Sequence, residues 1–166
     1  QSGHVDAPII ELDGSGSGGA IGLNVGTAAT GSTVRGLVVN GFGSYGLLVL
    51  AADTTIAGNY IGTDLAGTAP AGNTLAGIVV LANNVTIGGV VDSDRNVVSG
   101  NTGEGIWVFS GTGTTIRGNY IGVDKDGGGT GLGNTANGGL ANYPITIGGT
   151  ALGARNVISG NGGDGV

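Results

Sequence analysis

The chain has 166 residues, 40 of them glycine, with five basic residues against eleven acidic ones and no cysteine. The lack of cysteine excludes disulfides, and the scarcity of basic residues disfavours binding to a phosphate backbone, so we expect no nucleic-acid partner. No apolar run is long enough to cross a bilayer, and we expect no membrane insertion.

The first 30 residues hold a mostly apolar segment at 8–12, interrupted by Glu11, and a Gly/Ser-rich loop at 14–19. Farther along, short apolar runs at 36–39, 46–50 and 77–81 are bounded by turn-forming residues, which is typical of short strands. We expect one solenoid segment over residues 1–166, with residues 1–30 as a leading coil and loop and residues 31–166 as repeat coils.

The chain repeats itself at a spacing of 60 residues: 54–64 return as 114–124, and 95–101 return as 155–161. A fixed period of this kind indicates a stacked array. Isoleucines at spacings of 31, 29 and 31 divide the 60-residue unit into two coils: Ile56, Ile87, Ile116 and Ile147. Because each strand type recurs only after a whole coil, the sequence predicts an all-β parallel β-helix of roughly five to six coils.

Asparagines recur at one bend of the predicted coils. We predict that their side chains form a hydrogen-bonded ladder and that they adopt the left-handed backbone conformation at this bend: Asn59, Asn96, Asn119 and Asn156. Two residues farther along, an inward aliphatic stack is predicted from Ile61, Val98, Ile121 and Ile158. These residues are expected to hold the coils together.

Three motifs carry a resemblance that covers about residues 30–166. They are Gly-Asn-Tyr-Ile-Gly-x-Asp at 58–64 and 118–124, Arg-Asn-Val-[Val/Ile]-Ser-Gly-Asn at 95–101 and 155–161, and Ile-Gly-Gly at 87–89 and 147–149. The chain resembles the right-handed parallel β-helix family of pectin and pectate lyases and, more closely, the tandem repeats of large bacterial secreted or surface proteins. The resemblance implies a right-handed β-helix and an extracellular or cell-surface location, in a bacterium.

Enzymes of this family act on acidic polysaccharides through paired aspartates, or through Asp clusters that hold calcium beside a basic residue. Neither arrangement is evident, and the sequence assigns no catalytic residue. Asp124 and Asp126 flank Lys125 in an Asp-x-Asp-Gly pattern, which makes them weak candidates for Ca²⁺. The equivalent loop at 64–67 has one acid only, so a solvated turn is the preferred interpretation, and no metal or other cofactor is predicted.

Aromatic residues offer a candidate carbohydrate contact if they face outward: Trp107, Tyr60 and Tyr120. A structural stack explains the two tyrosines equally well, because they occupy equivalent positions two coils apart. Threonine pairs at 54–55 and 114–115 also lie two coils apart, and the sequence therefore predicts no continuous threonine row of the kind that binds ice.

Two kinds of function remain. The leading hypothesis is a structural segment of a secreted or cell-surface protein, serving as a stalk, an adhesin shaft or a filament subunit. Its partner would be itself or neighbouring repeats, stacked coil on coil, and we expect the chain to be an excerpt of a longer array. The alternative is a carbohydrate-active or carbohydrate-binding domain for an acidic polysaccharide. An enzyme, which we do not favour, would be a polysaccharide lyase or a glycoside hydrolase.

Overall fold

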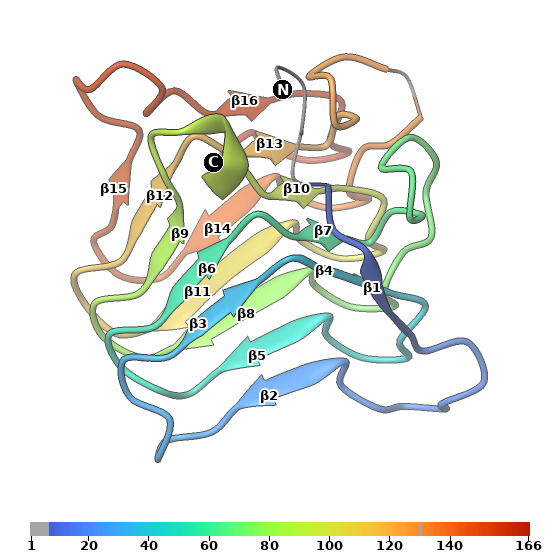
Figure 1. The fold of residues 1–166 in the computed structure, drawn as a ribbon, viewed down its shortest axis with the longest axis horizontal. Helices are drawn as coiled ribbons and strands as arrows, with labels where there is room; N and C mark the ends of the chain where they lie inside the picture. Colours follow the sequence, from blue (N-terminus) through green and yellow to red (C-terminus); the bar gives the residue numbers. More distant parts are fainter. Residues whose placement is uncertain (1–6, 130) are drawn as a thin grey trace.

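The computed structural model describes residues 7–129 and 131–166, and its regular structure consists almost entirely of short β-strands. In this part of the chain the strands form three parallel sheets, shown in Figure 1. The predicted all-β, right-handed parallel β-helix is confirmed. The described residues include no helix long and apolar enough to cross a membrane.

Each sheet takes every third strand of the chain. Sheet A contains β1 (Ile10–Asp13), β4 (Leu37–Asn40), β7 (Tyr60–Ile61), β10 (Val97–Val98), β13 (Tyr120–Ile121) and β16 (Val157–Ile158). Sheet B contains β2 (Leu23–Val25), β5 (Leu47–Val49), β8 (Ile78–Leu81), β11 (Ile106–Ser110) and β14 (Gly139–Ala141). Sheet C contains β3 (Thr33–Arg35), β6 (Thr55–Ala57), β9 (Thr86–Gly88), β12 (Thr115–Arg117) and β15 (Thr146–Ile147). One 3-10 turn, η1 (Asp92–Asp94), precedes β10.

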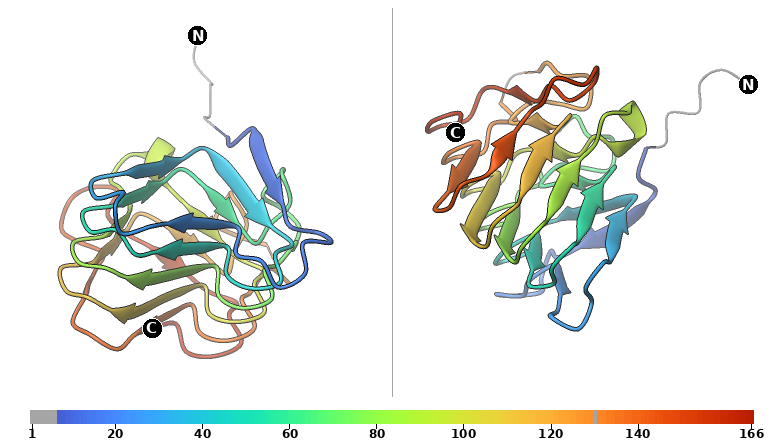
Figure 2. Two further views of the ribbon diagram at one scale, coloured as in Figure 1. Left: turned by 90° about the horizontal axis from the view of Figure 1, so that it is seen from below. Right: turned by 90° about the vertical axis from the view of Figure 1, so that its left-hand side faces the viewer.

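One strand from each sheet makes a coil, so β1 to β15 form coils 1 to 5, and β16 begins coil 6. This agrees with the predicted five to six coils. Figure 2 shows the coils stacked in chain order, from blue to red. In sheet A, Ile61 pairs with Val98, Val98 with Ile121, and Ile121 with Ile158, at spacings of 37, 23 and 37 residues. Two coils therefore make one 60-residue repeat.

Branched aliphatic side chains fill the inside of the stack in register. Ile61, Val98 and Ile121 are almost completely buried, whereas Ile158 in coil 6 is half-buried. Each such burial stabilises the fold by about 1.5–3 kcal/mol. The core is a column of matching side chains, one layer per coil.

Loops of different length distinguish the coils. Coils 3 and 5 are the long ones, since each carries an extended loop after its sheet A strand, at 62–77 in coil 3 and, among the described residues, at 122–129 and 131–138 in coil 5. Coil 4 has only a short turn at the same place, and the two long loops meet across it: the backbone N–H of Lys125 donates to the carbonyl of Gly67 at 3.0 Å. The loops thus cover one side of the outer face of sheet A.

Candidate functional site

The asparagines at the bend between sheets C and A form a continuous row of side-chain hydrogen bonds. The Nδ2 group of Asn59 donates to Oδ1 of Asn96 at 3.0 Å, and Asn96 donates to Asn119 at 2.9 Å. Asn119 in turn donates to Asn156 at 3.2 Å. Asn59, Asn96 and Asn119 are completely buried. We call this row the first asparagine ladder.

The prediction that these asparagines adopt the left-handed backbone conformation was wrong. The residues with positive φ at the bend are Gly58 (64°) and Gly118 (69°), one position before the asparagine, and no ladder asparagine has a positive φ. In coil 4 the corresponding residue is Arg95, with a φ of −63°. Glycine accommodates the strained conformation because it has no Cβ, so the asparagine is left to satisfy backbone groups.

A second asparagine ladder, not predicted from the sequence, runs along the turn between sheets A and B. The Nδ2 group of Asn73 donates to Asn101, Asn101 donates to Asn134, and Asn134 donates to Asn161, each at 2.9 Å. The row is not evident in the sequence because loops of different length give its members irregular spacings of 28, 33 and 27 residues. The shared sequence signal is a glycine directly before each asparagine and a second glycine four residues after it.

Both ladders end at coil 2, where apolar residues replace the asparagines. The backbone N–H of Leu37 donates to Oδ1 of Asn59 at 3.0 Å, and the N–H of Phe42 donates to Oδ1 of Asn73 at 3.2 Å. Leu37 and Phe42 therefore stand at the ladder positions and supply only a backbone donor. The two ends of the stack differ in chemistry.

The outer face of sheet A carries a cavity of about 480 Å³. It is lined by Tyr60, Val97 and Tyr120, which come from three successive coils, and by Arg95 and Lys125. The guanidinium of Arg95 lies over the ring of Tyr120, with Cζ 4.4 Å from the ring centroid, and donates to the Asp92 carboxylate at 2.7 Å. Both cations at this cavity are thus already paired with a neighbouring acid, Lys125 with Asp126 at 2.9 Å.

The two tyrosines lie beneath loops. Gly67 packs against the ring of Tyr60, and Gly127 packs against the ring of Tyr120. Tyr60 is only 7% exposed, which leaves little of its ring for the predicted carbohydrate contact, whereas Tyr120 is half-buried. Burial raises the pKa of the Tyr60 phenol, an effect that the ammonium of Lys125 opposes and the carboxylate of Asp126 reinforces.

The acids proposed as weak calcium candidates have other partners. Oδ1 of Asp124 accepts the backbone N–H groups of Asp126 and Gly128, both at 2.9 Å, and Asp126 accepts the Lys125 ammonium, whose pKa this bond raises. In coil 3, Asp64 accepts two backbone N–H groups in the same manner. Within the described residues, no three His, Cys, Asp or Glu side chains gather as metal ligands would. Asp124 thus closes a turn.

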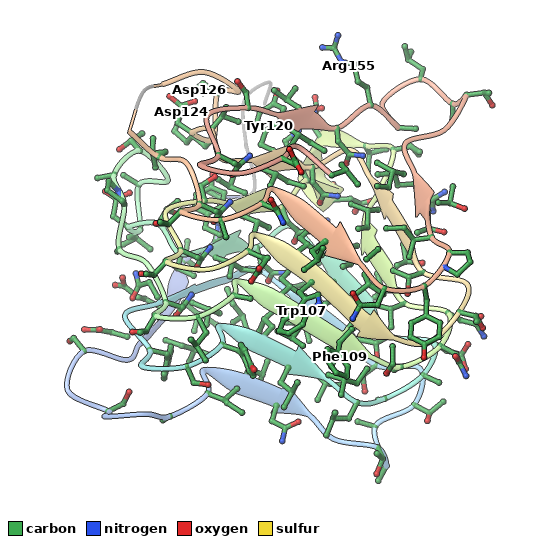
Figure 3. The ribbon with its side chains drawn as sticks, turned by 180° about the vertical axis from the view of Figure 1, so that it is seen from behind. Trp107, Phe109, Tyr120, Asp124, Asp126 and Arg155 are labelled. Carbon is green, nitrogen blue, oxygen red and sulfur yellow. The ribbon has the colours of Figure 1, made fainter. Side chains whose placement is uncertain are left out.

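Trp107 faces outward from sheet B. It contacts Phe109 two residues away, with ring centroids 5.1 Å apart and an interplanar angle of 76°. Phe109 is 45% exposed, and Figure 3 shows the pair together on the outer face of this sheet. This pair lies on a different face of the molecule from Tyr60 and Tyr120, so the three predicted contact residues do not form one platform.

Sheet C carries a threonine row that the sequence reasoning missed. Register places one threonine in each of five successive coils: Thr33, Thr55, Thr86, Thr115 and Thr146. The expectation of a discontinuous row was wrong because Thr86 fills the gap between the two repeat copies. The row is one residue wide, since the neighbouring outward positions hold Arg35, Ala57, Gly88 and Arg117.

Comparisons of the chain with protein-family models, with curated proteins and with solved structures found no match. The function is therefore inferred from the contacts within the stack and on its faces.

Substitution of Asn96 by alanine should lower the free energy of unfolding by about 2–4 kcal/mol, because several buried partners lose their hydrogen bonds, among them the Ile56 carbonyl and the Asn59 N–H. Urea denaturation measures this change. The matched control is Asn142→Ala, which removes a single exposed bond of 3.4 Å and should change stability by less than about 0.5 kcal/mol. Equal losses in the two variants would contradict the role of the ladder.

Stability should fall at alkaline pH in a way that depends on Tyr60. Its raised pKa means that the folded state holds the phenol proton after the unfolded state has lost it. The contribution of Tyr60 to the free energy of unfolding is therefore complete below the ordinary tyrosine pKa of about 10 and is lost as pH rises through the raised pKa. Thermal unfolding between pH 8 and 11 should show a shallower alkaline loss of stability for Tyr60→Phe than for Tyr143→Phe, which removes the hydroxyl of a residue that is 48% exposed. The same slope in both variants would refute this assignment.

Proposed function

We propose that the chain is a structural β-solenoid segment of a secreted or cell-surface protein, part of a stalk or adhesin shaft. The observation that carries the proposal is the pair of asparagine ladders, each of which connects four successive coils through side-chain bonds. Buried amides that bond to the next coil stabilise a stack but perform no chemistry.

The repeat itself supports a structural role. The polar residues that recur after 60 positions include Asn96, which bonds to the next coil, and Arg95, which lies over a tyrosine of the next coil. Ser99 also recurs, and its hydroxyl donates to the Val123 carbonyl at 2.7 Å and accepts the Gly122 N–H at 2.9 Å. The repeated polar residues thus make the contacts that hold one coil on the next. The resemblance to tandem repeats of bacterial secreted or surface proteins favours the same function and an extracellular location.

Electron microscopy over a range of protein concentrations, combined with a panel of acidic glycans, tests this proposal. Five to six coils at about 4.8 Å per coil give a rod roughly 25 Å long. We expect discrete short particles that turn over no glycan, as a segment of a longer shaft would. Filaments would also support a structural role, through assembly between copies. Turnover of pectin, alginate or a related polymer would contradict it.

Carbohydrate binding is the second candidate, and the observation that favours it is the pair formed by half-buried Trp107 and exposed Phe109 on the outer face of sheet B. Aromatic rings on a strand face offer flat apolar surfaces against which sugar rings can stack. Arg95 and Lys125, on the sheet A face, would suit an acidic polymer, although each is paired with a carboxylate. We place this role below the structural one because the two features lie on different faces.

Binding of acidic polysaccharides, measured by calorimetry, tests the second candidate. If Trp107 forms the contact, Trp107→Ala should weaken binding about twofold to tenfold, the range expected for one aromatic contact. The control is Leu152→Ala, which removes a 98% exposed apolar side chain away from sheet B. Equal affinity of the two variants, or no binding by the unmodified chain, would eliminate this role for Trp107.

A further inference from the structure

Coil 4 contacts coil 5 through four side chains of one motif. The guanidinium of Arg95 lies over Tyr120, and Asn96 donates to Asn119. Ser99 bridges to the backbone of coil 5, and Asn101 donates to the side chain of the second-ladder asparagine. All four contacts run toward the C-terminal end of the stack. The partners on coil 5 are the ring of Tyr120, the side chains of Asn119 and Asn134, and the backbone N–H of Gly122.

Coil 6 carries the same four residues at the same positions: Arg155, Asn156, Ser159 and Asn161. Its strand β16 lies at the end of sheet A, as β14 and β15 lie at the ends of sheets B and C. Within the described residues, the bonds of the two asparagine side chains run only back toward earlier residues, for example from Nδ2 of Asn156 to the Ile116 carbonyl at 3.0 Å. Figure 3 shows the Arg155 side chain extending beyond the last coil.

We propose that the end face formed by β14, β15 and β16 binds a further β-helix coil of defined chemistry. This coil presents a tyrosine to Arg155, an asparagine to Asn156, a backbone N–H to Ser159 and an asparagine to Asn161, as coil 5 does for coil 4. The proposal rests on the proposed structural function and adds the identity of the partner. A stacked tyrosine contributes a cation–π contact, and each amide restores a ladder bond.

The opposite end of a second copy does not meet these requirements. Register places Ile10 of β1 against Leu37, so an isoleucine stands at the first ladder position of coil 1. Glu11 occupies the tyrosine position and would pair with Arg155 by charge, but the Asn156 amide would face an apolar side chain. Coil 2 likewise has Leu37 and Phe42 at the two ladder positions. The end face therefore selects a repeat coil over the first coil of another molecule.

The test compares two extended chains by amide hydrogen exchange. In the first, a copy of residues 107–166 follows Val166, which continues the repeat because 161–166 corresponds to 101–106. In the control, the appended copy alone carries Asn119→Leu, Tyr120→Val and Asn134→Phe, the residues that coil 2 has at these positions. We expect the first extension to slow hydrogen exchange at the backbone N–H groups of Asn156 and Asn161 by roughly fivefold or more, as one net hydrogen bond implies. The control extension should have no such effect.

Arg155→Ala provides a second readout that does not depend on the appended asparagines. It should leave the thermal stability of the 166-residue chain unchanged and lower that of the first extension, and the difference between the two measures the contact with the appended tyrosine. Equal protection by the two extensions, or an equal effect of Arg155→Ala in both chains, would overturn the proposal. So would protection of Asn156 and Asn161 in the 166-residue chain that rises with concentration, since a second copy would then occupy the face.

The two proposals fail in distinguishable ways. Glycan turnover would refute the structural function but would leave the exchange rates of Asn156 and Asn161 unaffected. Equal protection by both extensions would refute the selectivity of the end face while leaving a structural rod in place.

Discussion

The structure depends on the need to satisfy buried backbone groups at the turns of every coil. A parallel stack brings each turn to within about 4.8 Å of the next, where no water can reach the N–H and carbonyl groups of the bend. The Asn96 amide meets this need by bonding to the Ile56 carbonyl, to Asn59 and to Asn119. Turns that carry such an amide must stay aligned, and loops can lengthen only between them.

The loop insertions follow from this constraint. The 60-residue repeat alternates a long coil with a short one, so the loops of coils 3 and 5 meet over coil 4, where Lys125 donates to Gly67. The same loops cover the tyrosines of sheet A, with Gly67 on Tyr60 and Gly127 on Tyr120. Tyr60, a candidate surface aromatic in the sequence, is thereby enclosed. The partly exposed aromatic pair of the fold, Trp107 and Phe109, lies on sheet B instead.

Alternation also gives the stack a direction. Long coils present Gly-Asn-Tyr, short coils present Arg-Asn-Val, and the Arg95 side chain reaches forward to Tyr120 rather than back to Tyr60. The ladders point the same way, since each Nδ2 group donates to the asparagine of the following coil. Leu37 and Phe42 terminate the rows at one end, which makes the two ends chemically unequal.

The period of 60 residues by itself determined the coil architecture, the inward position of Ile61, Val98 and Ile121, and the alignment of Asn59, Asn96 and Asn119, because stacked coils must repeat their buried residues at matching positions. Only the tertiary structure decided which residues meet across coils of unequal length. The Asn73 row and the threonine row through Thr86 have irregular spacings, since loop insertions shift residue numbers without shifting positions in space. The burial of Tyr60 and the positive φ of Gly58 were likewise decided by packing, which brings together chain segments that local sequence does not connect.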